Sequence, residues 1–325
     1  MKKIKISSLW NSTVDINNSV IVNLIKILSK RDIEFSPINK SDILFFGPYE
    51  EHSIINYVKR RIINSVKKKN NIEDFFPNID FYTFKRKLKP IKIYLSWENY
   101  TLPNFKHDFS ITSFLGINNK NHLRFPLWKN LIDWSHVGLN RKLDPYAERF
   151  DSYYNIDELM RPQGETFMNK PRKACLISSH LNEPRKSFYL KFKEKSLIDG
   201  FGPIFDNQIK DHYSNPIKKK KILMNYAFNL CPENSLFPGY YTEKIPEAFL
   251  GKCLPITWAD NNVYNDFNKK SFINLLEHTK DDFSEIMELI KSNNFLKKFT
   301  TEPLLLKKPN LDNEINFVKK ILDFI

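Results

Sequence analysis

Short continuous runs of apolar residues alternate along the chain with longer segments in which apolar residues recur at helical spacing. The apolar runs predict buried strands, and the amphipathic segments predict helices that cover them. The predicted strands are Ile4–Ile6, Ile43–Phe46, Ile91–Leu95, Phe109–Thr112, His122–Phe125, Lys173–Ser178, Tyr226–Cys231 and Cys253–Trp258. The predicted helices are Val20–Leu28 with Ser19 as N-cap, His52–Lys69, Lys186–Lys195, Glu243–Leu250, Phe283–Lys291 and Glu314–Ile325, and Asp199–Pro203 is predicted to be a turn. This alternation is typical of parallel α/β sheets.

The pattern of strands and helices restarts once, after a linker at Arg161–Gly164. A chain of 325 residues fits two domains, at roughly 100–200 residues per domain. We therefore predict two doubly wound α/β domains that face a cleft, residues 1–160 and 161–310. Residues 311–325 are predicted to form a C-terminal helix that packs back on the body of the protein.

The stretch from Asn225 to Asp260 contains more polar groups than a simple connection between a strand and a helix needs. A strand, a polar loop, a helix and a second strand follow one another there, which predicts a βαβ unit. In such a unit the loop after the strand and the start of the helix form a shelf for ligands. The shelf carries Glu233, Asn234, Ser235, Tyr240, Tyr241, Glu243 and Lys244. We interpret it as an anion or nucleotide site, and the alternative is an N-capped helix with ordinary turn residues.

The charge of the chain is strongly basic. There are 51 Lys and Arg residues against 37 Asp and Glu residues, a formal net charge of +14, with basic runs at Lys67–Lys69, Lys85–Lys87 and Lys218–Lys221. Such a charge fits a nucleic-acid-binding protein, or an enzyme that acts on phosphorylated donors at an anionic membrane surface. A coding bias toward Lys, Asn and Ile explains the surface lysines equally well, and we give this interpretation the most weight for the short lysine runs.

The three cysteines, Cys175, Cys231 and Cys253, lie in or beside apolar runs and lack metal-ligand spacing. They predict buried free thiols in a reducing compartment. No apolar run approaches the ~20 residues of a membrane span, and the polar segment Ser7–Asn18 follows the basic N-terminus where a signal peptide would be apolar. We therefore expect a cytoplasmic protein and leave peripheral attachment to the inner membrane open.

Three motifs resemble those of one enzyme family. The stretch Tyr226–Trp258, with Pro232–Ser235 and Gly239–Ile245 inside it, resembles the signature of the α1,3/4-fucosyltransferase family. Two further resemblances precede it, to the family's acceptor-domain motif at Trp97–Asn99, Pro103–Phe105 and Asp108–Ile111, and to its first donor-domain motif at Ile177–Ser179 and Pro184–Lys186. Together they extend from Ile91 to Leu276.

The chain also departs from the family pattern at two places. Tyr241 replaces a small apolar residue, and Trp258-Ala259-Asp260 stands where a Trp-Gly is more usual. Neither departure removes a charged functional group.

The resemblance implies a GT-B fold of two Rossmann-like domains, GDP-fucose as the donor substrate, inversion at the fucose carbon, and no obligatory metal or other cofactor. In agreement with the last point, the sequence has no Asp-x-Asp pair of the kind that metal-dependent transferases use. The implied enzyme is a bacterial-type α1,3-fucosyltransferase. It would transfer L-fucose to the 3-hydroxyl of GlcNAc in a glycan such as N-acetyllactosamine, for Lewis-type antigens on lipopolysaccharide or glycoprotein.

Under this resemblance the departing diphosphate needs cations and N–H donors, because no metal neutralises it. Arg185 and Lys244 are the candidates, and Glu243 is expected to accept hydrogen bonds from the ribose hydroxyls of GDP. The remaining candidates for donor binding are Asn234, Ser235 and Tyr240. Glu233 could equally be an acceptor for the backbone N–H groups of its own loop. Each of these residues also has a purely structural interpretation as a cap, a loop acceptor or a surface residue.

Glu98 is the candidate general base. It follows a predicted strand directly, and a carboxylate that faces the cleft can remove the proton of the attacking hydroxyl. The alternative is a strand-end residue that accepts backbone N–H bonds. Asp108 and His122 are weaker candidates, and His122 fits a structural role better.

Two rival functions remain open: a transferase that uses another GDP-sugar, and a basic nucleic-acid-binding protein. A third, a degenerate sugar-binding relative without turnover, is disfavoured because Glu98, Arg185, Glu243 and Lys244 are all present. Because no nucleic-acid motif supports the second, the expected partners are GDP-fucose and a GlcNAc-containing glycan, without nucleic acid. Acceptor identity, α1,3 against α1,4 linkage, oligomeric state and the role of Tyr49–Pro90 remain open.

Overall fold

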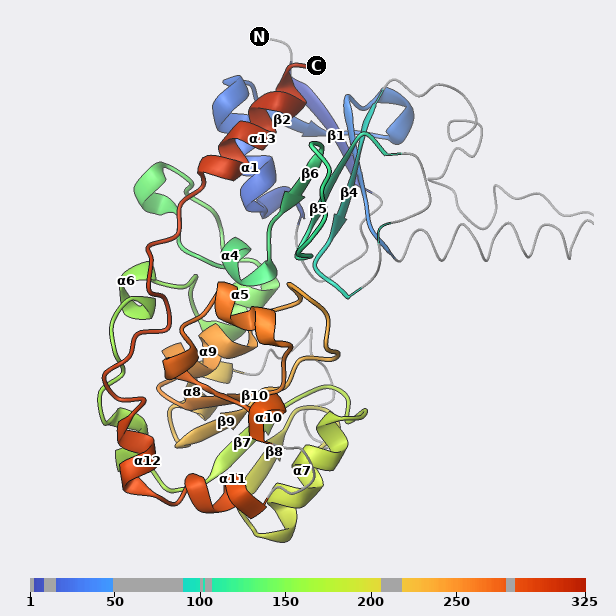
Figure 1. The fold of residues 1–325 in the computed structure, drawn as a ribbon. Coiled ribbons are helices and arrows are strands. Elements are labelled where there is room, and N and C mark those ends of the chain that lie inside the picture. The colour runs from blue at the N-terminus through green and yellow to red at the C-terminus, as the bar shows by residue number, and fades with distance from the viewer. Residues whose placement is uncertain are drawn as a thin grey trace, which may run out of the picture. The chain divides into compact units, whose positions relative to one another are not determined.

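The computed structural model describes residues 3–8, 16–48, 90–99, 102, 107–205, 218–278 and 284–325. The helix predicted at His52–Lys69 and the motif residues Pro103–Phe105 lie outside these ranges. The chain divides into two compact units (Figure 1). Unit 1 comprises Met1–Phe125 and Leu311–Ile325, and unit 2 comprises Pro126–Asn310.

A parallel sheet forms the core of unit 1. In the part of the unit that the structure describes, its strands run in the order β2-β1-β3-β4-β5-β6. Their bounds are Ile4–Ser8 (β1), Ile33–Phe35 (β2), Ile43–Phe46 (β3), Ile91–Ser96 (β4), Phe109–Thr112 (β5) and His122–Arg124 (β6). Every residue of β3 and β5 is buried. Burial explains why β3 reads as a continuous apolar run. Strand β5 instead alternates apolar residues with the small polar residues Ser110 and Thr112, which are buried as well.

Two helices of unit 1 lie side by side although they come from opposite ends of the chain (Figure 1). They are α1 (Val20–Ser29) and α13 (Asp312–Leu322). The predicted N-cap of α1 is confirmed, because the Ser19 side chain accepts a hydrogen bond from the backbone N–H of Val22. On α13, the ring of Phe317 packs edge-on against Phe109 of β5. The predicted packing of the C-terminal helix on the body of the protein is thereby confirmed, and it places this helix in unit 1.

The sheet of unit 2 is also parallel, and within the described ranges its order is β11-β10-β9-β7-β8. The bounds are Ala174–Ile177 (β7), Ile198–Phe201 (β8), Phe228–Leu230 (β9), Leu254–Thr257 (β10) and Ile273–Asn274 (β11). The strand order reverses at β7, since β8 lies on one side of it and β9 on the other. The connections after β7 and β9 therefore lead away from each other and leave a crevice at the carboxyl ends of these strands.

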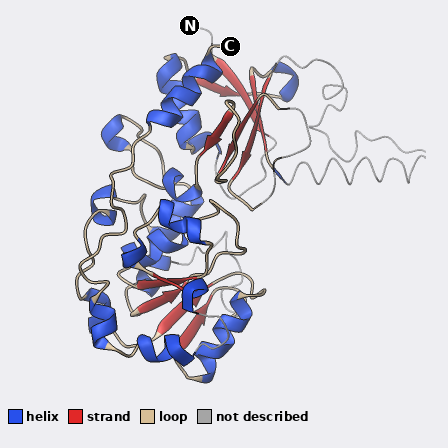
Figure 2. Cartoon of the chain, in the orientation of Figure 1, coloured by secondary structure: helices blue, strands red, loops and turns tan. Residues whose placement is uncertain are grey.

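Helices cover both faces of this sheet (Figure 2). On one face, apolar side chains of α7 (Arg185–Glu194) and α11 (Ser284–Leu289) share a buried cluster with the strands. On the other, α8 (Lys219–Leu223) and α9 (Lys244–Leu250) pack beside β7 and β10. The other α-helices in the described part of unit 2 are α4 (Leu127–Asn130), α5 (Pro145–Phe150), α6 (Ile156–Leu159), α10 (Leu275–His278) and α12 (Asn293–Lys297). The predicted doubly wound α/β class is confirmed for both units.

The boundary between the units differs from the predicted one. The structure places it between residues 125 and 126, whereas the linker-like Arg161–Gly164 suggested a boundary at residues 160 and 161. The reason is that the intervening segment packs on α9: α6 lies against this helix, and the Tyr154 hydroxyl donates a 3.1 Å hydrogen bond to Glu247.

The turn predicted at Asp199–Pro203 is confirmed only at its end, where the chain bends at Gly202 and turns at Pro203. Its first three residues belong to strand β8, which pairs with β7. Its two glycines stand where a side chain would collide with neighbouring atoms. A Cβ on Gly200 would lie 2.4 Å from the ring of Phe205, and a Cβ on Gly202, which has a φ of +112°, would lie 2.3 Å from the carbonyl oxygen of Ser178. The backbones after β7 and β8 therefore come close together, which fixes Ser178 at the crevice.

None of the helices in the described ranges has the length and apolar character needed to cross a bilayer.

Candidate active site

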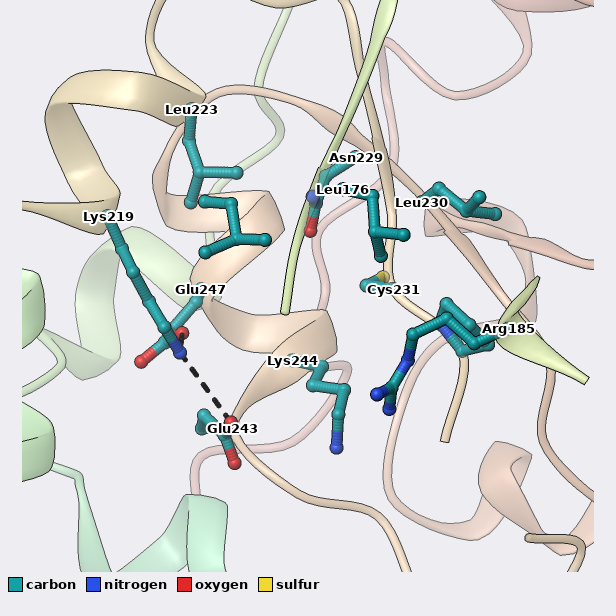
Figure 3. Close-up of a pocket in the computed structure, with 12 residues that line it drawn as sticks. Leu176, Arg185, Lys219, Leu223, Asn229, Leu230, Cys231, Glu243, Lys244 and Glu247 are labelled. Atoms are coloured by element: carbon teal, nitrogen blue, oxygen red, sulfur yellow. Dashed lines mark hydrogen bonds and ion pairs between the residues drawn. The ribbon is translucent and has the colours of Figure 1, made fainter. Parts of the chain in front are cut away.

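A pocket lies at the carboxyl ends of β7 and β9, where the strand order reverses (Figure 3). Its walls come from the ends of both strands, from α8, and from the first turns of α7 and α9. The lining residues are Leu176, Ile177, Arg185, Lys219, Leu223, Asn229, Leu230, Cys231, Pro232, Glu243, Lys244 and Glu247. Three residues predicted for donor binding, Arg185, Glu243 and Lys244, are thus brought together by the fold.

Lys244 is held by a buried acidic partner. Its ammonium lies 2.7 Å from Glu233 Oε2 and 2.8 Å from the Thr242 hydroxyl, and the Glu233 side chain has no exposed surface. Burial lowers the pKa of Lys244, but the carboxylates of Glu233 and Glu243 outweigh burial and raise it above its usual value. Lys244 therefore stays protonated in the pocket.

Glu233 itself also serves its own loop. Its Oε1 accepts hydrogen bonds from the backbone N–H of Thr242 at 2.9 Å and from the Thr242 hydroxyl at 3.1 Å. This is the role of loop acceptor that the sequence left as an alternative. Glu233 thus fixes both the segment before α9 and the position of the Lys244 ammonium.

Arg185 connects the loops after the two central strands. Its Nη1 donates to the Ser178 hydroxyl at 2.8 Å and to the His180 carbonyl at 2.9 Å, and its Nη2 donates to Asn234 Oδ1 at 2.5 Å. Asn234 in turn donates to the hydroxyl of the buried Tyr240 at 3.1 Å. Burial lowers the pKa of Arg185, but its ordinary value is so high that the guanidinium keeps its charge.

Arg185, Asn234 and Tyr240 therefore form one chain of hydrogen bonds, in which Asn234 contacts Arg185 and Tyr240 contacts Asn234. Ser235, the next residue of the loop, is half-buried. Figure 3 shows the charged ends of Arg185, Lys244 and Glu243 gathered at one side of the pocket.

Glu243 is a buried carboxylate between two lysines. Burial alone would raise its pKa, but Lys244 and Lys219 outweigh burial and lower the pKa to about 2. The Lys219 ammonium lies 3.6 Å from Glu243 Oε1 and 2.7 Å from Glu247 Oε2. Glu243 is therefore ionised at neutral pH and available as a hydrogen-bond acceptor.

The site predicted from the sequence did not include Lys219 and Glu247, which line the pocket, or Tyr154, which is bonded to Glu247. Lys219 belongs to the basic run Lys218–Lys221, which was interpreted as a solvated face, yet its side chain is only 15% exposed. Glu247 follows Glu243 by four residues, so the two carboxylates lie on one face of α9, and this spacing was a signal in the sequence. No sequence signal pointed to Tyr154, which lies far from Glu247 along the chain.

The two departures from the family pattern contact each other. The hydroxyl of the buried Tyr241 donates to the Asp260 carboxylate, 3.0 Å from each oxygen. The same carboxylate accepts a bond from the backbone N–H of Asn262 and so caps the short helix Asn261–Asn265. The polar group that Tyr241 introduces is thus satisfied by the residue at the other unusual position.

Glu98 lies in unit 1, two residues after β4, and is half-buried, and its backbone N–H donates to the Ser96 hydroxyl at 3.2 Å. Its placement opposite the donor residues remains a prediction. The weaker candidates have structural partners. Asp108 accepts a 2.8 Å bond from the backbone N–H of Lys92, and His122 Nδ1 lies 2.9 Å from the Ser110 hydroxyl. Burial, with a contribution from His107, lowers the pKa of His122 to about 4, so its ring is neutral at pH 7.

Within the described ranges, no group of three or more His, Cys, Asp or Glu side chains is arranged to hold a metal ion.

Comparison with known proteins finds a family model that matches most of unit 2. Residues 167–302, which include β7 to β11 and every residue that lines the pocket, match the model "Glycosyltransferase family 10 (fucosyltransferase) C-term". The match covers 136 of the 325 residues of the chain. The resemblance stated from the motifs is thereby confirmed.

Two curated proteins are similar to the chain. The α-(1,3)-fucosyltransferase FucT of Helicobacter pylori is 30% identical over 226 residues, which are 63% of this chain and 46% of that protein. A putative fucosyltransferase, R654, of Acanthamoeba polyphaga mimivirus is 28% identical over 149 residues, 42% of this chain and 25% of that protein. The chain thus spans about half the length of the first relative and a quarter of the second.

Solved structures extend the likeness of fold to both units. A crystal structure of an α1,3-fucosyltransferase with GDP-fucose matches with a TM-score of 0.59 at 23% identity, and covers 99% of this chain and 89% of that one. A structure titled as the α1,3-fucosyltransferase alone matches with a TM-score of 0.59 at 24% identity. The predicted GT-B class with two Rossmann-like sheets is confirmed by this match.

A double-mutant cycle tests the contact between Tyr241 and Asp260. We expect Tyr241→Phe and Asp260→Ala each to lower the free energy of unfolding, with a coupling energy of about 1–2 kcal/mol, because the buried hydroxyl donates to a charged acceptor. Urea unfolding of the four proteins measures the coupling. Tyr153→Phe, which removes an exposed hydroxyl that donates to the Lys142 carbonyl, is the control and should change little. Additive effects of the two substitutions would show that the contact contributes no stability.

Proposed function

We propose that the protein is an α1,3-fucosyltransferase that uses GDP-fucose as donor. The observation that carries this proposal is the pair of cations, Arg185 and Lys244, in the pocket of the segment that matches the glycosyltransferase family 10 model, at the point where the strand order reverses. The similar H. pylori protein is named an α-(1,3)-fucosyltransferase, and a structure with the same fold contains GDP-fucose. A sugar nucleotide also accounts for these cations better than a nucleic acid, since both cations line one small pocket and are partly buried there.

The diphosphate would bind between the two cations. Arg185 offers a planar guanidinium that can donate to two phosphate oxygens, and Lys244 offers a point charge. Both are already held in place by hydrogen bonds, to Ser178 and Asn234 for Arg185 and to Glu233 for Lys244. Because these charges need not reorganise during the reaction, they stabilise the developing charge of the leaving diphosphate.

The remaining donor contacts follow from the loop before α9. Glu243 would accept hydrogen bonds from the ribose hydroxyls, since its carboxylate stays ionised in the pocket. Asn234, Ser235 and Tyr240 would form the wall of the nucleotide site on the side of Arg185.

For the acceptor, we propose the 3-hydroxyl of GlcNAc in a glycan such as N-acetyllactosamine, within Lewis-type glycans on lipopolysaccharide or glycoprotein. Glu98 would take the proton of this hydroxyl while the oxygen attacks C1 of fucose. The new C1–O bond forms as the bond from C1 to the β-phosphate oxygen breaks, and the electron pair of that bond leaves with GDP. Attack from the face opposite the leaving group inverts C1, and the two cations supply the charge that a metal provides in other transferases.

We further propose a cytoplasmic protein that attaches peripherally to the inner membrane. The three cysteines are free and buried, as suits a reducing compartment, and the net charge of +14 favours anionic lipid surfaces. Co-sedimentation with vesicles that contain anionic lipid would test the attachment, and its absence at low salt would exclude it.

The activity is tested with the purified protein, GDP-fucose and N-acetyllactosamine. We expect GDP release and a fucosylated product whose linkage, determined by NMR, is α1,3 to GlcNAc. GDP-mannose in place of GDP-fucose should give no product, and EDTA should leave the rate unchanged. A product with GDP-mannose alone would favour the rival GDP-sugar transferase, and loss of activity in EDTA would contradict metal independence.

The roles of the two cations are tested by GDP binding. Arg185→Ala should weaken GDP affinity by about 10–100-fold, because a charge-assisted hydrogen bond contributes about 1.5–3 kcal/mol. Lys244→Met is made in a protein that already carries Glu233→Gln, so that no unpaired carboxylate is left buried. Relative to the Glu233→Gln protein, we expect a similar loss of GDP affinity. Calorimetry measures both. Lys252→Ala, which removes a surface lysine 3.8 Å from Glu158, is the matched control. Unchanged affinity in the first two variants would contradict their contact with the diphosphate.

The role of Glu98 is tested by separating turnover from donor binding. Glu98→Gln keeps the shape of the side chain but cannot accept the proton, so we expect kcat to fall by about 10²–10⁴-fold while GDP affinity stays near that of the wild type. Asp108→Asn is the control and should retain activity, because Asp108 is bonded to the backbone of Lys92. Normal turnover by the Glu98→Gln protein would show that another group is the base.

A further inference from the structure

Lys219 differs from the other lysines of its run. Its side chain is 15% exposed, whereas that of Lys218, the preceding residue, is 49% exposed and pairs with Asp151 at the surface. Lys219 begins α8 and points across to α9, where it meets two buried carboxylates, Glu243 and Glu247 (Figure 3). A lysine that loses this much solvent needs a compensating interaction, which these carboxylates supply.

Glu247 fixes the position of the Lys219 ammonium. The residue is buried, and both of its carboxylate oxygens have partners: Oε1 accepts from the Tyr154 hydroxyl at 3.1 Å, and Oε2 lies 2.7 Å from Lys219 Nζ. Tyr154 is itself fully buried and packs edge-on against Phe150. The carboxylate therefore has little freedom to move, and the ammonium that it binds is confined to one place.

From that place, the second neighbour of Lys219 is Glu243. The distance from Lys219 Nζ to Glu243 Oε1 is 3.6 Å, which is longer than the 2.7 Å from the same atom to Glu247 Oε2. Of these two carboxylates, only that of Glu243 is proposed to contact the ligand. Without Lys219, the cations that still act on Glu243 are Lys244, the next residue of the chain, and Arg149. A Glu243 carboxylate drawn to Lys244 would lose its orientation toward the ribose and would compete with the diphosphate for that lysine.

We propose that Lys219 is a positioning residue, which orients the Glu243 carboxylate toward the ribose hydroxyls of the donor nucleotide and keeps it apart from Lys244. The inference rests on the proposed function, because it assigns the ribose contact to Glu243. In this arrangement the carboxylates of Glu233 and Glu243 are paired with different lysines, and Lys219 is shared with Glu247. Glu233 pairs with Lys244 on the side of the phosphates, and Glu243 pairs with Lys219 on the side of the ribose.

The test compares GDP with 2′-deoxy-GDP and 3′-deoxy-GDP by calorimetry on the full chain. The wild type should bind GDP about tenfold more tightly than at least one deoxy analogue, the value of a hydrogen bond to a charged acceptor. In Lys219→Met this preference should fall to near unity, mainly because GDP binds more weakly. Lys219→Arg, which keeps the charge, should retain part of the preference, and Lys218→Met is the control that should retain all of it.

Lys219→Met leaves the buried Glu247 carboxylate without its cation and could unfold the protein. A second variant therefore separates the effect on binding from an effect on folding. In Lys219→Met with Glu247→Gln, no unpaired carboxylate remains beside Tyr154, and the amide oxygen can still accept from the Tyr154 hydroxyl. We expect this protein to unfold at a temperature near that of the wild type and to lack the preference for ribose. A merely structural role for Lys219 predicts equal changes for GDP and both deoxy analogues, and this outcome would overturn the proposal.

The outcomes also separate this proposal from the proposed function. A wild type that does not bind GDP would contradict the proposed function, and with it the inference. A wild type that prefers GDP to the deoxy analogues, together with variants that keep the preference, would overturn the role of Lys219 alone.

Discussion

The pairing of buried carboxylates with lysines around the start of α9 is the constraint on which the pocket depends. Removing charges from water is costly, and a buried ion pair forms only where geometry and further hydrogen bonds compensate for desolvation. Glu233 meets that condition through Thr242 and Lys244, and Glu247 meets it through Tyr154 and Lys219. Loss of one partner of such a pair typically costs about 3–5 kcal/mol. The same contacts that keep the fold intact therefore hold the cations where an anionic ligand would need them.

The topology explains why these groups meet. Since β8 and β9 lie on opposite sides of β7, the loops after β7 and β9 diverge, and the space between them is open to a ligand. Arg185 crosses that space from the start of α7 to the loop that carries Asn234. The free protein thus already joins the two loops by a side chain, and a diphosphate would meet a cation whose position is fixed beforehand. Preorganisation of this kind lowers the entropy that binding must otherwise offset.

Much of this could be predicted from the sequence, because local signals were strong. The apolar runs gave eight of the eleven strands in the described ranges and missed β2, β8 and β11. Ser19 gave a helix start, and the polar stretch that leads into α9 gave two lining residues of the pocket, Glu243 and Lys244. What could not be predicted depends on contacts between distant segments. Tyr154 joins Glu247 only after residues 126–160 have folded onto α9, so the boundary between the units was misplaced for the same reason. Gly200 resembled a turn residue because the ring of Phe205 that requires it is brought there by packing.

The contact between Tyr241 and Asp260 shows how two departures from a family pattern can be explained together. A tyrosine in place of a small apolar residue would bury a hydroxyl, and an unsatisfied buried hydroxyl is costly. An aspartate after β10 supplies the acceptor and also caps the helix Asn261–Asn265, so it has a partner even without the tyrosine. The aspartate is therefore tolerable alone, whereas the tyrosine is not. Through this contact the loop after β10 supports the segment that leads into Glu243 and Lys244.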